Sequence, residues 1–393
     1  LVLHNYMDFD DLKDYVKISY ELTQDGLVIS KGKLPEVSAA PHSEGKINLK
    51  INVPESGKCY LKFIYHLKKE LPLLDEDYIL GFDEIEVSQK DAKCQLAEKW
   101  VEKTVTDSEL QVSEDDTQIH IKGREFAYTI DRRTALFTEM KFAGREYLNH
   151  PMELNIWRAP TDNDMYIKSE WKKAHYDKAY TRAYTTEVVQ GKHGVKITSH
   201  ASVVAETVQK ILDVTITWKI EAAGKIDADI AVTKDDEFPD LPRFGVRMFL
   251  DKKLSAARYF GMGPQESYCD KHQAASHGLY HANVDDLHED YIRPQENGSH
   301  YDCEYVELNN SRYGIVVSAE NAFSFNASYY TQEELEKKTH NYELTESDSV
   351  VFCVDYALNG IGSNSCGPVV LDQYRFDDVL FRFQFTLIPY VKG

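Results

Sequence analysis

The sequence predicts an all-β protein, and three observations lead to that class. Apolar and polar residues alternate with a period of two along most of the chain, as they do in strands that bury one face. Long amphipathic helices do not alternate with strands, which argues against a (β/α) barrel and against a dinucleotide-binding sheet. Only one helix is evident, in TQEELEKKTH, where Thr331 and Glu334 form a capping box.

The first part of the chain contains a set of short predicted strands. They lie at Lys17–Leu22, Leu27–Lys33, Lys46–Val53, Cys59–Leu67 and Phe82–Val87. We therefore expect residues 1–90 to form a β-sandwich of about the size of an immunoglobulin-like domain. The next stretch, at 91–109, is charged and weakly periodic, so we expect a linker there.

From residue 110 to residue 393 the strand pattern resumes and continues to the end of the chain. One face of a strand carries Leu212, Val214, Ile216, Trp218 and Ile220, and a turn at Gly224 leads into a second strand with the same alternation. FRFQFTL repeats the pattern near the end. So many strands in one block favour a large domain built from two sheets.

Composition excludes several functional classes. The 393 residues carry a formal charge of −20, which repels nucleic acid and anionic lipid. No apolar run has the length of a membrane span, and the N-terminus lacks the features of a signal peptide. Because the chain begins with Leu1, we expect it to be a piece of a longer polypeptide. The six scattered cysteines indicate reduced thiols and a cytoplasmic protein, with no metal or cofactor bound by this chain.

NIWRAPTDNDMY, residues 155–166, combines Trp, Arg, Pro and two acids in one irregular run. We interpret it as a loop of fixed shape, in which Arg158 is clamped by the carboxylate of Asp162 or Asp164. Direct contact of these residues, or of Asn163, with a ligand is compatible with the same clamp. A calcium loop is excluded because the glycine and the closing glutamate of that motif are missing.

Two further motifs each place a glutamate after Pro-Gln. FGMGPQES contains Glu266, and RPQENGSH contains Glu296. A glycosidase needs two such carboxylates on either side of one bond. The alternative is that each carboxylate binds a turn backbone or an arginine.

NGIGSNSCGP, residues 359–368, is a glycine-rich loop that presents Asn364, Ser365 and Cys366. It is not a phosphate loop, because the required lysine and following helix are absent. Such a loop either lies close to a sugar or a neighbouring domain, or is an ordinary connection between strands.

In their order and separation, NIWRAPTDND, YFGMGPQESYCD, YIRPQENGSHYDCEYVEL and NGIGSNSCGP resemble the C-terminal domain of the large β-galactosidases of glycoside hydrolase family two. LPRFGVRM, residues 241–248, is similar to a strand of the same domain, and DFDDLKDYVKISYELTQDGLVISKGKLP looks like the immunoglobulin-like domain before it. For residues 110–393 the resemblance implies a supersandwich like that of galactose mutarotase.

The resemblance also implies a role. In that family both catalytic glutamates lie on a TIM barrel upstream of these domains, so neither Glu266 nor Glu296 is expected to be catalytic. The parent enzyme hydrolyses terminal β-D-galactosides with retention, and this chain completes its substrate pocket and its domain assembly. The residues expected at that pocket or domain junction are Arg158, Asp162, Asn163, Asp164, Asn364, Ser365 and Cys366. Cys366 lies near the position where many relatives carry a sugar-stacking Trp, so an aromatic platform is absent or supplied elsewhere.

Two alternatives differ from this expectation. One is an intact aldose 1-epimerase, in which Glu296 with His300, or Glu266 with His272, supplies the acid and base. The other is a separate small subunit or carbohydrate-binding module of a two-chain β-galactosidase. In the family, Mg or Na is bound by the barrel, and the parent is expected to be a homo-oligomer that binds neither nucleic acid nor membranes.

Overall fold

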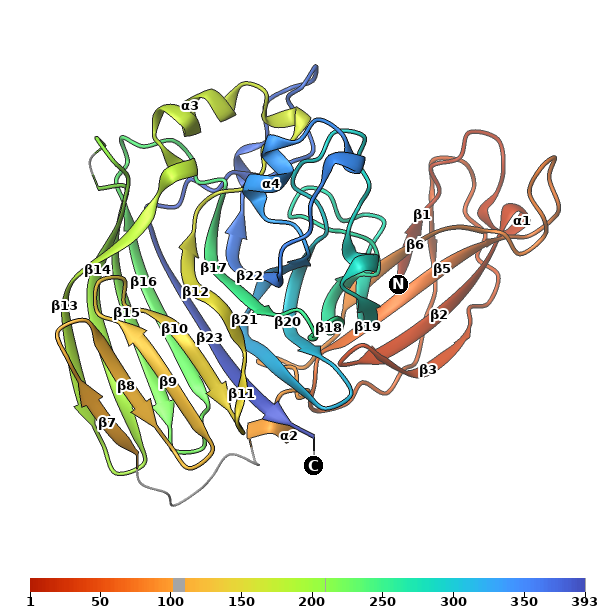
Figure 1. The fold of residues 1–393 in the computed structure, drawn as a ribbon. Helices are drawn as coiled ribbons and strands as arrows, with labels where there is room; N and C mark the ends of the chain where they lie inside the picture. Colours follow the sequence, from red (N-terminus) through yellow and green to blue (C-terminus); the bar gives the residue numbers. More distant parts are fainter. Residues whose placement is uncertain (102–109, 209, 393) are drawn as a thin grey trace. The chain divides into compact units, whose positions relative to one another are not determined.

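The computed structural model describes residues 1–101, 110–208 and 210–392. It divides into two compact units (Figure 1). Unit 1 comprises Leu1–Leu96 with His277–Leu279, and unit 2 comprises Ala97–Ser276 with Tyr280–Gly393. Residues 102–109 of the predicted linker 91–109 lie outside the described residues, so the domain boundaries stay a prediction.

Unit 1 is built on a four-stranded antiparallel sheet with the order β3-β2-β5-β6. Its strands are β2 (Val16–Gln24), β3 (Leu27–Lys33), β5 (Cys59–Leu67) and β6 (Ile79–Glu86). A short pair, β1 (Val2–His4) with β4 (Glu44–Lys46), and the helix α1 (Leu12–Tyr15) complete the regular structure. The core of the unit gathers around Leu22, Leu61 and Phe63.

The prediction of a strand at Lys46–Val53 is wrong. β4 ends at Lys46, and Ile47 still exchanges two main-chain hydrogen bonds with Leu1, but residues 47–54 form no strand. The predicted inward face is nevertheless correct, since Ile47 is buried and Leu49 and Ile51 pack against the core of unit 1. Alternation of apolar residues predicts which side chains point inward, but it does not predict whether a partner strand lies beside them.

Unit 2 contains two sheets, as the sequence predicts. The smaller sheet has the order β11-β10-β9-β8-β7. Its strands are β7 (Gln111–Glu114), β8 (Gln118–Lys122), β9 (Phe126–Asp131), β10 (Leu136–Phe142) and β11 (Arg145–Glu146). Figure 1 shows these strands lying across part of the larger sheet.

The larger sheet has twelve strands. The main path is β12-β17-β22-β21-β23-β16-β15-β14-β13, and β20, β18 and β19 continue from β21. The strands are β12 (Leu148–Asn155), β13 (Tyr180–Gln190), β14 (Gly194–Val204), β15 (Leu212–Glu221), β16 (Ile226–Lys234), β17 (Arg243–Asp251), β18 (Ala256–Gly263), β19 (Ser276–Asn283), β20 (Ser299–Asn309), β21 (Tyr313–Ser328), β22 (Ser349–Leu358) and β23 (Leu380–Val391).

Trp218 shows how the two sheets share one core. The five alternating residues of β15 that the sequence places on one face are all buried, and Trp218 is fully buried among them. Its ring lies edge-on to Phe137 of the smaller sheet, with centroids 4.9 Å apart, and its Nε1 donates to the carbonyl of Ala135 at 2.8 Å. The all-β class and the double-sheet architecture of the large unit are therefore confirmed.

Helices are few and short. Besides α1 they are α2 (Glu98–Val101), α3 (Ile167–Lys173) and α4 (Gln332–Lys337), with 3-10 turns η2 (Asp162–Asp164), η3 (Tyr176–Lys178), η4 (Asp285–Leu287), η5 (Asn341–Glu343) and η6 (Asp372–Tyr374). The Thr331 hydroxyl caps α4 by accepting from the amide of Glu334, which is one half of the predicted capping box, while the Glu334 carboxylate accepts from the amide of Thr345. Sequence patterning missed α3, because a seven-residue helix with one buried residue, Trp171, has too little periodicity to be recognised. Both α3 and α4 lie at one end of the strands (Figure 1).

Candidate functional site

The loop that follows β12 is held by its own polar side chains. The Oδ1 of Asn155 accepts from the amide of Trp157 at 3.0 Å and turns the chain out of the strand. The amide of Thr161 donates to the Oδ2 of Asp164 at 2.9 Å, which fixes the start of η2. The two tryptophans Trp157 and Trp171 meet edge-on, so the loop is anchored to α3.

Arg158 forms the predicted clamp with Asp164. Its Nε and Nη2 donate to the two carboxylate oxygens at 3.1 and 2.7 Å, a bidentate geometry that fixes both side chains. The guanidinium also lies over the ring of Trp171, 5.2 Å from its centroid. Asp162 takes no part in the clamp, and its carboxylate accepts instead from Gln295 at 3.4 Å.

The same arginine binds the glycine-rich loop. Nη1 and Nη2 of Arg158 donate to the carbonyls of Asn359 and Gly360 at 2.5 and 3.2 Å. The Nδ2 of Asn163 donates to the carbonyl of Ile361 at 2.6 Å. The backbone of one loop is therefore the binding partner of the side chains of the other.

The motif around Glu266 contributes Asp270, which sequence reasoning did not single out. Its carboxylate accepts from the amides of Ile361 and Gly362 at 3.0 and 2.7 Å. Arg158 thus binds carbonyl groups of the glycine-rich loop, and Asp270 binds amide groups of the same loop. Asp270 is part of the quoted stretch YFGMGPQESYCD, but nothing in the spacing indicates which acid of that stretch binds a distant backbone.

The motif around Glu296 joins the same place. The amide of Glu296 donates to the carbonyl of Ala159 at 2.9 Å, and the amide of Asp162 donates to the Oε1 of Gln295 at 3.0 Å. Four segments, 155–166, 260–270, 293–300 and 359–366, therefore meet through hydrogen bonds, and we call them the motif cluster.

Beneath the motif cluster lies a fully buried charge network. Nε and Nη2 of Arg243 donate to Asp355 at 3.0 and 2.5 Å, and Nη1 donates to the Oε2 of Glu296 at 3.1 Å. Burial alone would lower the pKa of Arg243, but the two carboxylates outweigh it and raise the pKa well above its ordinary value. Burial raises the pKa of Glu296, with Arg243 and Arg158 acting in the opposite direction.

The side chains considered as acid and base of an epimerase are buried or bound to other groups of the protein. Glu296 is 3% exposed and His300 is 1% exposed, so neither reaches a sugar from solvent. Burial lowers the pKa of His300 to about 4. Glu266 binds the amide of Gly298 at 2.9 Å together with Lys271 and the Tyr291 hydroxyl, and His272 binds the carbonyl of Tyr268. Each carboxylate therefore binds an arginine, a lysine or a turn backbone.

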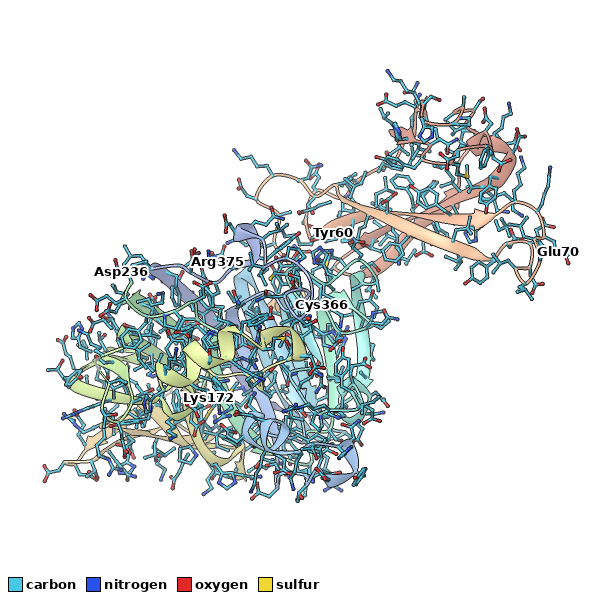
Figure 2. The ribbon with its side chains drawn as sticks, turned by 90° about the horizontal axis from the view of Figure 1, so that it is seen from above. Tyr60, Glu70, Lys172, Asp236, Cys366 and Arg375 are labelled. Carbon is cyan, nitrogen blue, oxygen red and sulfur yellow. The ribbon has the colours of Figure 1, made fainter. Side chains whose placement is uncertain are left out.

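The last three predicted site residues lie on the outer part of the glycine-rich loop. Asn364 and Ser365 are partly exposed, and Cys366 is exposed and carries a free thiol. Figure 2 looks onto the end of the unit that carries both Cys366 and Lys172 of α3. The structure brings Arg158, Asn163 and Asp164 together with the base of this loop, while residues 364–366 extend beyond it.

An aromatic cavity of about 300 Å³ adjoins the motif cluster. Tyr268, Cys269 and Leu358 connect it to the cluster, and the carbonyl of Tyr374 accepts from the amide of Gly360 at 2.8 Å. Its wall includes the rings of Tyr301, Phe323, Tyr356, Tyr374 and Phe376. These residues are far apart in the sequence, so no sequence motif predicts that they form one cavity.

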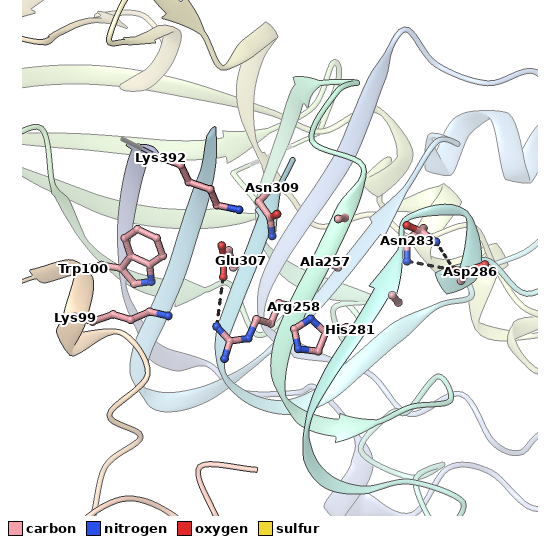
Figure 3. Close-up of a pocket in the computed structure, with 12 residues that line it drawn as sticks. Lys99, Trp100, Ala257, Arg258, His281, Asn283, Asp286, Glu307, Asn309 and Lys392 are labelled. Atoms are coloured by element: carbon pink, nitrogen blue, oxygen red, sulfur yellow. Dashed lines mark hydrogen bonds and ion pairs between the residues drawn. The ribbon is translucent and has the colours of Figure 1, made fainter. Parts of the chain in front are cut away.

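A second cavity, of about 580 Å³, contains none of the predicted site residues (Figure 3). Arg258 lies in it, 3.9 Å from the carboxylate of Glu307. Glu307 already accepts from the hydroxyls of Tyr305 and Tyr390, so its position is fixed by the core. The motif cluster is therefore the better candidate for function.

The described residues also bear on membrane and metal sites. No helix among them is long and apolar enough to cross a membrane. Within the same residues no three His, Cys, Asp or Glu side chains are grouped to hold a metal ion.

Comparison with solved structures gives low scores. A galactose 1-epimerase from Lactobacillus acidophilus aligns with a TM-score of 0.37 and 8% identity, over 74% of this chain and all of its own. The fold assignment rests on the sheets described above.

Sequence comparison is far more specific. A family model for the "Beta galactosidase small chain" matches residues 122–387, and one for "Beta-galactosidase, domain 4" matches residues 1–88. A β-galactosidase from Actinobacillus pleuropneumoniae is 43% identical over 99% of this chain, and one from Staphylococcus xylosus is 31% identical over 98%. The chain spans 38% of the length of each of these relatives. The small-chain model covers most of unit 2, and the Actinobacillus relative aligns with 99% of this chain. The chain therefore belongs to the β-galactosidase family and corresponds to its domain 4 and small-chain regions.

Proposed function

We propose that this chain is the non-catalytic part of a β-galactosidase, and that it completes the substrate pocket and stabilises the domain assembly. The parent hydrolyses terminal β-D-galactosides with retention, through a covalent galactosyl intermediate. Its catalytic carboxylates belong to a barrel that the described residues do not include. The observation that carries the proposal is the motif cluster, where the conspicuous carboxylates bind protein groups.

The surface around the motif cluster supports a role in assembly. Large apolar side chains are exposed in or within five residues of three of its four segments: Met165 and Tyr166 after η2, Ile292, and Val369 and Leu371 after the glycine-rich loop. Exposed apolar groups that gather on a fixed framework are typical of a surface that another domain covers. We propose that the barrel domain of the parent covers them.

The pocket residues follow from this arrangement. Arg158 and Asp164 are buried, so we propose that they position the loop. Asp162, Asn163, Asn364, Ser365 and Cys366 lie at the surface or partly so, and we propose that they line the edge of the pocket. The tyrosines of the adjoining cavity are candidates for the aromatic platform that Cys366 does not provide.

Other properties of the parent belong to the same proposal. We propose that Mg or Na is bound by the barrel, that the protein is cytoplasmic, and that the parent is a homo-oligomer. The barrel is supplied either by the same polypeptide or by a separate large chain.

Reconstitution tests the proposal. The chain is mixed with a polypeptide that carries the region of the Actinobacillus relative outside the match, and hydrolysis of a chromogenic β-galactoside is followed. We expect no hydrolysis by either piece alone and recovered hydrolysis by the mixture. Failure of a folded mixture to form a complex would contradict the assembly role, and hydrolysis by the 393-residue chain alone would contradict its non-catalytic role.

The epimerase alternative is tested separately. Polarimetry on freshly dissolved α-D-galactose reports whether the chain accelerates mutarotation. Because Glu296 and His300 are buried, we expect the rate to equal that of buffer. A catalysed decay of rotation that is lost in His300→Gln would establish an epimerase instead.

A further inference from the structure

A cavity of about 330 Å³ lies beside the end of β12, and we call it the Trp157 cavity. The second half of β12 and the residues that follow it, Met152 to Trp157, form one wall. Other walls come from the smaller sheet, from the segment around η3 and from Arg247 of β17. Its volume is at the lower end of the range for small-molecule sites and suits one small ring.

Two buried hydrogen-bond donors of this cavity have no partner. They are the Nδ2 of Asn155 and the Nε1 of Trp157. Both residues line the cavity and are nearly inaccessible, with 4% and 3% of their surface exposed. The Oδ1 of Asn155 is already bound to the Trp157 amide, which fixes the direction of the free Nδ2. Buried donors are rarely left unsatisfied, because their desolvation is not compensated.

The other tryptophans show that this is unusual for the chain. Trp100 donates to the Tyr305 hydroxyl, Trp171 to the carbonyl of Asp240, and Trp218 to the carbonyl of Ala135. Of the four tryptophans in the sequence, Trp157 alone keeps an unpaired buried indole N–H in the described structure. Chance underpacking would not be expected to place a second orphan donor two residues away in the same cavity.

The remaining polar groups of the cavity are mostly acceptors. Carboxylates of Asp131, Glu153, Asp177 and Glu333 line it. Its guanidinium, that of Arg247, is bound to Glu153 and Glu333. Asp131 is paired with Arg133 and Asp177 with Lys172, so four carboxylates face three cations. The one remaining negative charge disfavours an anionic ligand, and carboxylate lone pairs suit hydroxyl donors.

The apolar part completes the chemical description. Met152, Leu154 and Ile156 are buried in the wall, and the ring of Tyr176 lies beside them. A ligand for this cavity must accept from two N–H groups, donate to carboxylates and present apolar faces without a negative charge. Sugar rings meet these conditions, because their hydroxyls both donate and accept and their C–H faces pack on apolar side chains.

We propose that the Trp157 cavity, at the start of the loop 155–166, is a binding site for a neutral sugar ring. Ligand oxygens accept from the Nδ2 of Asn155 and the Nε1 of Trp157, and ligand hydroxyls donate to the carboxylates. Asn155 and Trp157 belong to the same loop as Arg158, but the cavity lining contains none of the residues assigned to the galactoside pocket, so binding here is tested independently of hydrolysis.

Saturation-transfer NMR and calorimetry on the whole chain test the site, with D-galactose, D-glucose and D-galacturonate as probes. We expect saturable binding of at least one neutral sugar and weaker binding of galacturonate. Trp157→Phe keeps the ring but removes the N–H, so it should weaken binding about 5- to 10-fold, the value of one hydrogen bond. Because that N–H has no protein partner, the variant should melt no earlier than the wild type.

Two controls locate the effect. Trp100→Phe removes an indole donor elsewhere in unit 2, and Lys173→Ala breaks an exposed ion pair on α3, so both should keep the wild-type affinity for the sugar. Equal binding by Trp157→Phe and wild type would overturn the proposal. So would the absence of saturable binding of both neutral sugars, or a crystal grown in saturating sugar that shows only a water between the two donors.

Discussion

Arg158 and Asp164 are six residues apart in the sequence and form a bidentate ion pair whose side chains are 0% and 5% exposed. The same guanidinium binds two carbonyls of a loop that is 201 and 202 residues away. A local clamp is therefore also a long-range connection, and its removal should affect both loops.

Arg158→Ala should lower the free energy of unfolding by about 3–5 kcal/mol, because it leaves Asp164 as an unpaired buried charge. Urea denaturation of the variant and wild type measures this. Lys173→Ala is a suitable control, since it breaks only the exposed pair with Glu170 and should cost less than about 1 kcal/mol. If Arg158→Ala left both stability and the activity of the reconstituted enzyme intact, the loop would have neither role.

The two carboxylates on Arg243 should respond differently to neutralisation. Asp355 receives both arms of the guanidinium, so Asp355→Asn should cost about 3–5 kcal/mol. Glu296 receives one bond, keeps an unpaired Oε1, and is the second negative charge beside one guanidinium. Glu296→Gln should therefore cost no more than about 1 kcal/mol. Equal losses in urea denaturation would contradict this assignment of the charges.

His300 should make the protein less stable in mild acid. Burial lowers its pKa from 6.5 to about 4, so between these values the unfolded chain binds a proton that the folded chain does not. The stability contributed by neutral His300 is complete above pH 6.5 and is lost as the pH falls toward 4, by about 3 kcal/mol in total.

Unfolding free energies of wild type and His300→Gln, measured from pH 7.5 to 4.5, test this. The wild-type value should fall more steeply with decreasing pH than that of the variant, since the variant lacks the titrating ring. Parallel curves would show that His300 titrates normally in the folded protein.

Cys366 should be the first thiol to react. It is exposed, whereas Cys59, Cys303 and Cys353 are buried, and burial raises the pKa of Cys269 to about 11. Iodoacetamide labelling followed by peptide mass analysis should find Cys366 modified before these four, with Cys366→Ser as the control. In the complex with the barrel-bearing polypeptide its labelling should slow at least several-fold if the loop faces the pocket, and an unchanged rate would contradict that placement.

The sequence was sufficient for the class of fold and for the clamp. Alternation placed Trp218 and its neighbours on a buried face, because burial of one face of a strand imposes that period directly. The same signal misassigned residues 47–53, where side chains alternate in burial without a partner strand. For Arg158 the sequence left two partners, Asp162 and Asp164, because both are close in sequence and opposite in charge, and the structure selects Asp164.

The rest of the site depends on long-range contacts that no local pattern contains. Asp270 binds amides at Ile361 and Gly362, and a backbone amide has no signature in the sequence. Arg243 and Asp355 meet because β17 pairs with β22, so their relation follows from strand order. The aromatic cavity and the Trp157 cavity likewise exist only once distant strands are assembled.

The glycine-rich loop is fixed through hydrogen bonds to its main chain. Arg158 and Asn163 donate to three of its carbonyls, and Asp270 accepts from two of its amides. Side chains at 363–366 take no part in these bonds. A randomised library at those positions can therefore alter the outer rim of the loop while its anchorage stays constant. The same freedom lets a small thiol such as Cys366 or a broad aromatic ring stand on the rim without the loop being rebuilt.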